Sequence, residues 1–135
     1  MRRVAYTRFE GCGVIVFGSR PPEPAEWRAY ADFLRGMAEG KQRGILFSEG
    51  GSLEPYQRKE ADAILGSHKE HDRRIAVVTS STFTWGFVKA LSLFDPSYRS
   101  FHPDELDRAM AYVGLPRSAH REVTALAASL RAQVV

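Results

Sequence analysis

The chain has 135 residues, of which 44% are hydrophobic and 26% are charged. These fractions are ordinary for a soluble globular protein, and the length suits one domain with one real core. The net charge of +3 arises from 19 basic and 16 acidic residues that are spread along the chain. Because nucleic-acid-binding proteins usually cluster Lys and Arg on one face, this mixed pattern disfavours nucleic acid as a partner.

A single cysteine, Cys12, excludes an intramolecular disulfide framework. It lies between Gly11 and Gly13 in an expected turn, and no neighbouring group would lower its pKa, so we expect a small filler rather than a nucleophile. No apolar run approaches the roughly 18 residues that span a bilayer, so we expect no stable membrane insertion. Tyr6, Thr7, Arg8 and Glu10 soon after the N-terminus interrupt any signal-peptide core, so we expect a cytoplasmic location.

The first third of the chain predicts a hairpin and a helix. The segment Arg3–Glu10 alternates apolar and polar residues, and Val14–Phe17 is a continuous apolar run. With a glycine-containing turn over residues 11–13, these two segments predict an antiparallel β-hairpin. A proline-rich break follows, and then a helix is expected from about Pro24 to Glu39, with proline at its start, a regular apolar face and Gly40 as its stop.

The middle of the chain predicts two further strand–helix units. Gly44–Ser48 is typical of a short buried strand, and Ser52 is placed to cap a helix that has Pro55 in its first turn. Ile75–Thr79 is expected to be the central strand. A hydroxyl-rich turn follows it and leads into a helix whose apolar positions are Phe83, Phe87, Ala90, Leu91 and Phe94.

The last third predicts an edge strand over Tyr98–Phe101 and two helices. The first opens at Pro103 and stops at residues 114–116, and the second would be capped by Ser118. The order β-β-α-β-α-β-α-β-α plus a C-terminal helix predicts an α/β fold in a single domain over residues 1–135. We expect a mixed, mostly parallel sheet with an N-terminal β-hairpin and helices packed on it.

This order of elements resembles the STAS domain, typified by anti-sigma factor antagonists, and the bacterial proteins grouped as SpoIIAA-like or STAS/Sec14-like. The resemblance spans nearly the whole chain and is carried by Thr79-Ser80-Ser81 before a glycine-containing helix, by Ala90–Phe94 and by Phe101–Leu106. It implies the fold and a regulatory binding role. In antagonist STAS proteins a partner kinase phosphorylates a serine of an Asp-Ser pair at a helix start. The matching junction, Phe47–Leu53, lacks the Asp-Ser-Ser-Gly motif.

Two strand-to-helix junctions are candidate binding sites, Thr79-Ser80-Ser81-Thr82 and Ser48-Glu49-Gly50-Gly51-Ser52. Free backbone N–H groups and the helix dipole at the first junction suit an anion; the alternative is that Ser81 or Thr82 only caps the helix. Glycines at the second junction would admit a partner or a phosphate, or would simply permit the turn. Because parallel strands end at one edge of a sheet, we expect the two junctions to converge.

Trp85 follows the first junction, and two roles are open for it. Beside the loops it would anchor a protein partner or an acyl chain; alternatively it packs under the following helix. The C-terminal helix also has two readings. Its apolar stripe either covers the sheet or forms the seam of a homodimer. That stripe comprises Val123, Leu126, Ala127, Leu130 and Val134, and arginines lie opposite it.

No catalytic constellation is recognisable. The chain lacks a Ser-His-Asp order, a His-Glu-x-x-His motif, a Gly-x-Ser-x-Gly elbow and a phosphate-binding P-loop. His68 and His71 would share a helix face, but a third metal ligand at fixed spacing is missing. We therefore expect neither an enzyme nor a cofactor or metal.

These observations favour a non-enzymatic STAS-like binding or regulatory module. Its loops Ser48–Ser52 and Thr79–Trp85 would meet a protein partner or a small anionic ligand, and phosphorylation there would switch binding. The alternative is a Sec14-like carrier of a lipid or other apolar ligand, with a pocket lined by Phe47, Phe83, Trp85 and Phe87. A chain of this length leaves little volume beyond its own core, which favours the first hypothesis.

Overall fold

The computed structural model describes residues 2–39, 43–50, 53–66, 73–93 and 95–135. Within them the chain forms one five-stranded sheet in the order β1-β2-β3-β4-β5. β1 pairs antiparallel with β2, and all other neighbouring strands are parallel. The strands are β1 (Val4–Phe9), β2 (Cys12–Phe17), β3 (Arg43–Phe47), β4 (Arg74–Val78) and β5 (Tyr98–Phe101). The predicted mixed, mostly parallel α/β fold is confirmed.

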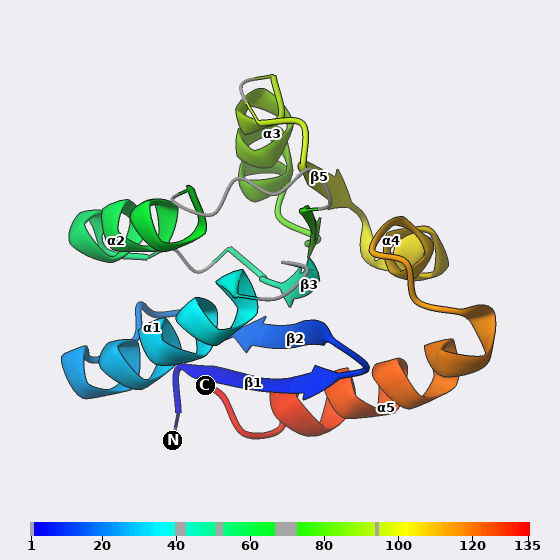
Figure 1. Cartoon of the computed structure of the whole chain (residues 1–135), viewed down its shortest axis with the longest axis horizontal. Coiled ribbons are helices and arrows are strands. Elements are labelled where there is room, and N and C mark those ends of the chain that lie inside the picture. The colour runs from blue at the N-terminus through cyan, green and yellow to red at the C-terminus, as the bar shows by residue number, and fades with distance from the viewer. Residues whose placement is uncertain (1, 40–42, 51–52, 67–72, 94) are drawn as a thin grey trace.

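Helices cover both faces of this sheet. Figure 1 shows α1 and α2 on one side and α4 and α5 on the other. α3 packs on β4 and β5, and its buried Val88 contacts Ile75 and Val77, which point to the α1 side. The helices are α1 (Pro24–Ala38), α2 (Pro55–Gly66), α3 (Thr82–Leu91), α4 (Leu106–Tyr112) and α5 (His120–Arg131), with short 3-10 turns η1 (Pro103–Glu105) and η2 (Arg117–Ala119).

The strand order explains which helices share a face. Parallel crossovers in one sheet take the same hand, so sequential strands place α1, α2 and α3 together. α4 and α5 follow the last strand and cover the opposite face. Neighbouring residues of one strand therefore enter different cores. Ile45 packs with α4 and α5, whereas Leu46 packs with the clusters of α1 and α3.

Three helices are more than this face can hold side by side. Neighbouring strands lie about 4.8 Å apart, so β2 to β5 span only about 14 Å. Packed helices need about 8–10 Å each. α1 reaches out to β1 and α3 lies over β4 and β5, whereas α2 makes its main contacts with α1. The middle helix is thus raised from the sheet, and this arrangement leaves space beneath it.

The hairpin turn is one residue earlier than predicted. It is formed by Glu10 and Gly11, which both have positive φ angles of 49° and 79°. Cys12 and Gly13 belong to β2, where Cys12 pairs with Phe9. Positive φ at both central positions is the geometry of a type I′ turn, whose twist matches that of the flanking strands and so favours this tight turn over a longer one. Cys12 is buried, as expected of a filler, and burial raises the pKa of its thiol to about 11.

The apolar positions of α3 are not buried as predicted. Phe83 is 83% exposed and Phe87 is 48% exposed, whereas Val88 is buried. α3 packs on the narrow β4–β5 edge of the sheet, so only one line of its side chains reaches the strands. The helical spacing was correct, but the apolar positions exceed what this edge can cover.

α5 shows the first of the two roles expected for its apolar stripe. Val123, Ala127 and Leu130 are buried in the core against the sheet, where α5 contacts β1 and β2. Ser118 is not the helix cap that we expected. It lies within η2, and Ala119 occupies the N-cap position of α5, because a 3-10 turn precedes the helix.

Candidate functional site

The two predicted junctions converge at one edge of the sheet. Ser48 follows β3 and Thr79 follows the adjacent, parallel β4. A Cβ atom on Gly50, which has a φ of 99°, would lie 3.7 Å from Ser81 Oγ. The Ser80 hydroxyl donates a hydrogen bond to the Glu49 carboxylate. Gly51 and Ser52 of the predicted site lie outside the described residues.

Two of the four hydroxyls of the first junction serve the turn itself. Ser81 is the N-cap of α3, and its Oγ accepts a hydrogen bond from the Thr84 backbone N–H at 3.2 Å. Thr79 is fully buried, and its Oγ1 accepts from the Ser81 N–H at 3.0 Å. Thr82 begins the helix and is exposed. The capping alternative therefore accounts for Ser81, and Thr79 stabilises the same turn.

A carboxylate already lies at this edge. Glu49 accepts the hydrogen bond of Ser80, and its Oε1 lies 3.6 Å from Nη1 of Arg131 on α5. Because the charges of Glu49 and Arg131 offset each other, this pair adds no net positive charge that would attract an anionic ligand. Arg131 was missed by the sequence analysis because it lies far along the chain and only the packing of α5 places it here.

Trp85 adopts neither of its two predicted positions. Its ring stacks on His102, with centroids 5.3 Å apart and planes inclined by 13°. Lys89 Nζ lies 4.6 Å from the centroid of the same ring. Among the described residues, no partner accepts a hydrogen bond from its buried Nε1. Trp85 is thus half-buried against the residue that precedes η1, rather than exposed or covered by a helix.

A cavity of about 280 Å³ lies between the sheet and the helices α1, α2 and α3. This is the space left beneath the raised α2. Its walls are mostly hydrocarbon side chains, and Ser48 and Thr84 connect it to the strand-end loops. Phe83 and Phe87 line it as predicted for a carrier, but Phe47 and Trp85 do not. Representative apolar lining residues are Leu34, Leu46, Ala61, Leu65, Val77 and Val88.

Few of the described residues that line this cavity are charged or polar. Arg58 and Asp62 lie on the exposed side of α2, and the Arg58 guanidinium carbon is 5.7 Å from the centre of the Phe87 ring. Burial raises the pKa of Asp62, and nearby arginines partly offset this effect. Burial also raises the pKa of Tyr98 to about 12 and raises that of Tyr30 further. Both hydroxyls therefore remain protonated at neutral pH.

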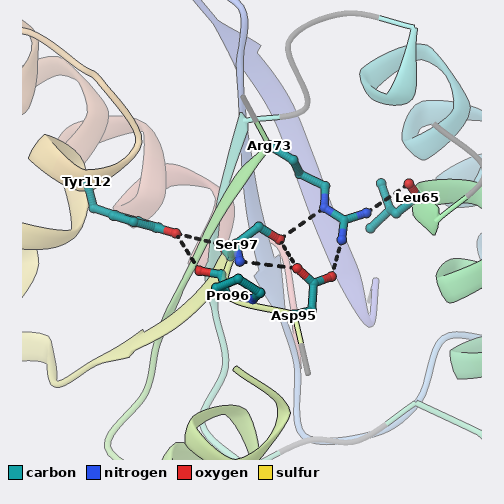
Figure 2. Close-up of polar contacts among 6 residues, drawn as sticks. All are labelled: Leu65, Arg73, Asp95, Pro96, Ser97 and Tyr112. Atoms are coloured by element: carbon teal, nitrogen blue, oxygen red, sulfur yellow. Dashed lines mark hydrogen bonds and ion pairs between the residues drawn. The ribbon is translucent and has the colours of Figure 1, made fainter. Parts of the chain in front are cut away.

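A polar network holds the opposite end of the cavity wall together. Figure 2 shows Arg73 donating to the Leu65 carbonyl at the end of α2 and to Ser97 Oγ, at 2.9 and 3.1 Å, and pairing with Asp95. The Tyr112 hydroxyl donates to the Ser97 carbonyl at 2.7 Å. These contacts join α2, β4, the α3–β5 loop and α4. The arrangement is typical of a structural clamp. No local sequence motif predicts it, because the residues of the network are spread over almost 50 positions of the chain.

Comparisons with known proteins do not extend this picture. No protein-family model, curated protein or solved structure matches the chain. The described residues contain no group of three or more His, Cys, Asp or Glu side chains that would hold a metal ion, and His68 and His71 lie outside them. No helix within the described ranges has the length and apolar character needed to cross a membrane.

Proposed function

We propose that this protein is a non-enzymatic carrier that binds a small, mainly apolar ligand between the sheet and helices α1, α2 and α3. The observation that supports this proposal is the cavity of about 280 Å³ and its hydrocarbon walls. Small-molecule sites are typically concave, mostly apolar and supplied with few polar groups, and their volumes begin at about 300 Å³. This function was the alternative hypothesis from the sequence, and the packing of α2 now favours it.

Packing physics supports a ligand in this space. Protein interiors are as dense as organic crystals and contain few voids larger than a water molecule. Apolar side chains that face such a void lose their dispersion contacts. A ligand would restore these contacts without any change in the chain. At the strand-end edge, the hydroxyls of Thr79, Ser80 and Ser81 already bond to the backbone of the turn or to Glu49.

The proposal is tested by titration with N-phenyl-1-naphthylamine, an uncharged apolar dye that fluoresces in apolar surroundings. We expect saturable binding at one dye per chain and a melting temperature that rises with dye concentration. Native mass spectrometry of the purified protein would show whether a ligand is carried from the host. If dye binding does not saturate and the melting temperature is unchanged, the carrier function is excluded.

Two exposed side chains, one on α3 and one in the segment after it, provide a matched pair of variants. Phe83 and Leu93 are each 83% exposed, but only Phe83 lines the cavity. We expect Phe83→Ala to weaken dye binding severalfold and Leu93→Ala to leave it unchanged. Both variants should retain wild-type stability within about 0.5 kcal/mol, since neither side chain is buried. Equal losses of binding in the two variants would indicate adsorption to exposed apolar surface instead of entry into the cavity.

A STAS-like regulatory module that meets a protein partner is the second candidate. It is favoured by the exposed Phe83 and the exposed Ser80, which lie at the same strand-end junction. A phosphate on Ser80 would add about −1.5 to −2 charges beside Glu49 and would break their hydrogen bond. Intact mass of protein from its native host tests this switch, and absence of phosphate under all growth conditions would eliminate it. Cytoplasmic location and a homodimer through the C-terminal helix belong to this second proposal.

A further inference from the structure

Two tyrosines line the apolar cavity, and no group in the described part of the chain hydrogen-bonds to their hydroxyls. Tyr30 on α1 and Tyr98 on β5 both line it. Tyr30 is only 3% exposed, and its ring packs against the aromatic rings of Phe17 and Trp27. Within the described part of the chain, neither hydroxyl forms a hydrogen bond. A hydroxyl that lines an apolar cavity without a protein partner is free to hydrogen-bond to a ligand that enters the cavity.

The two tyrosines line the same cavity. A charge on Tyr98 would also raise the pKa of Tyr30. Burial is the largest effect on both groups and favours their neutral forms. Each hydroxyl therefore has one proton to donate and lone pairs to accept with. Phenylalanine at either position would fill the same volume, so packing alone does not explain the oxygen atoms.

The charged groups around the cavity do not select a charged ligand. Among the described lining residues these groups are Arg58 and Asp62. They have opposite charges, lie four residues apart on α2 and belong to exposed positions. Residues with this spacing are neighbours on a helix surface, so their fields largely offset each other. A charged ligand in the cavity would lose its hydration, and the offsetting charges of Arg58 and Asp62 would not compensate for that loss.

Resting on the carrier function proposed above, we propose a chemical class for the ligand. It is an uncharged, mainly apolar molecule that carries a carbonyl or hydroxyl oxygen, and this oxygen hydrogen-bonds to Tyr30 and Tyr98 while the hydrocarbon part fills the space beneath α2. The hydroxyls thereby select among apolar molecules by the position of one oxygen. Sites built to pair a polar group discriminate strongly against analogues that lack it.

Three probes of similar size test this inference: acetophenone, isopropylbenzene and benzoate. Isopropylbenzene has the shape of acetophenone, with a methyl group in place of the carbonyl oxygen, and benzoate adds a charge. Dissociation constants are obtained from displacement of N-phenyl-1-naphthylamine. The variants are Tyr30→Phe, Tyr98→Phe and the double variant. Tyr56→Phe is the control, because Tyr56 is half-exposed and lies outside the cavity lining.

We expect each cavity variant to weaken acetophenone binding by about threefold to tenfold and to leave isopropylbenzene binding unchanged. Tyr56→Phe should alter neither, and benzoate should bind more weakly than acetophenone to the wild type. The unfolding midpoint of Tyr30→Phe should be equal to or above that of the wild type, since the lost hydroxyl has no partner in the described chain.

The outcomes separate this inference from the carrier function. If both neutral probes bind but their affinity ratio is the same in all variants, the hydroxyls do not recognise the ligand and only the inference fails. Tighter binding of benzoate than of acetophenone would also overturn it. A strongly destabilised Tyr30→Phe would reveal a structural role for the hydroxyl. If the dye and all probes fail to bind, the carrier function itself is wrong.

Discussion

Ala61 on α2 offers the most direct test of the space beneath this helix. Its side chain lines the cavity, whereas Ala63, two residues further along the same helix, is exposed and outside the lining. Ala61→Leu adds hydrocarbon to the empty space, and Ala63→Leu adds the same atoms at the surface. The two variants change helix propensity equally. Any difference between them therefore reports on the cavity.

The expected gain in stability follows from the burial of the added carbon atoms. Each buried methylene contributes about 0.8 kcal/mol, so three carbons contribute about 2.4 kcal/mol at full burial. The cavity is only partly enclosed, so we expect roughly half of this, about 1 kcal/mol. For a chain of this length such a change raises the melting temperature by about 4 °C. Ala63→Leu should stay within about 0.5 kcal/mol of the wild type.

Urea unfolding and dye titration measure the two consequences together. Ala61→Leu should raise the urea midpoint without changing the m-value, and it should weaken binding of N-phenyl-1-naphthylamine at least tenfold. The reasoning is refuted if Ala61→Leu lowers stability by 1 kcal/mol or more, since overpacking of that kind means that no space exists beneath α2. Unchanged dye binding alongside increased stability would place the dye elsewhere.

Two further predictions concern the clamp and the buried thiol. Arg73→Met should destabilise the chain by about 2–4 kcal/mol, because the Asp95 carboxylate loses its ion-pair partner. Arg35 belongs to a half-exposed ion pair, so the control variant Arg35→Met should cost less than about 1 kcal/mol. Equal urea midpoints for the two variants would contradict a structural role for the clamp. The folded-state pKa of Cys12, raised by burial to about 11 from about 9, means that the unfolded chain loses its proton first. The free energy of unfolding should therefore fall as pH rises from 9 to 11, and urea titrations of Cys12→Ala should show a shallower fall over that interval. If the wild type and Cys12→Ala lose stability in parallel, the Cys12 thiol is not the cause of the fall.

Much of the fold could be predicted because its signals are local. Apolar runs such as Ile75–Val78 form strands wherever they are buried on both faces, and the paired glycine and proline signals mark the turns between them. The convergence of Ser48 and Thr79 also followed from sequence, because parallel strands that neighbour each other must end at one edge. What those hydroxyls do was undecided until Ser81 was seen to cap α3 and Glu49 to accept from Ser80.

The errors have a common physical origin in packing between distant segments. Phe83 and Phe87 have the spacing of a buried helix face, yet they border a cavity because α3 meets only the edge of the sheet. The chain was expected to leave little volume beyond its core. The number of helices on one face of the sheet depends on the strand order and on the handedness of the crossovers, and neither can be read from local sequence. Three helices share one face here, and the expectation did not take this into account.

By itself, then, the sequence determined the elements, their approximate bounds and the mixed, mostly parallel sheet, since each depends on the periodicity and turn chemistry of a few neighbouring residues. Only the tertiary structure decided that the strands follow one another in sequential order, that α2 is raised above the sheet, and that Tyr30 and Tyr98 border the same cavity. The reason is geometric. Helices are wider than strands, so the space between them depends on how many helices share a face, and no local pattern records that number.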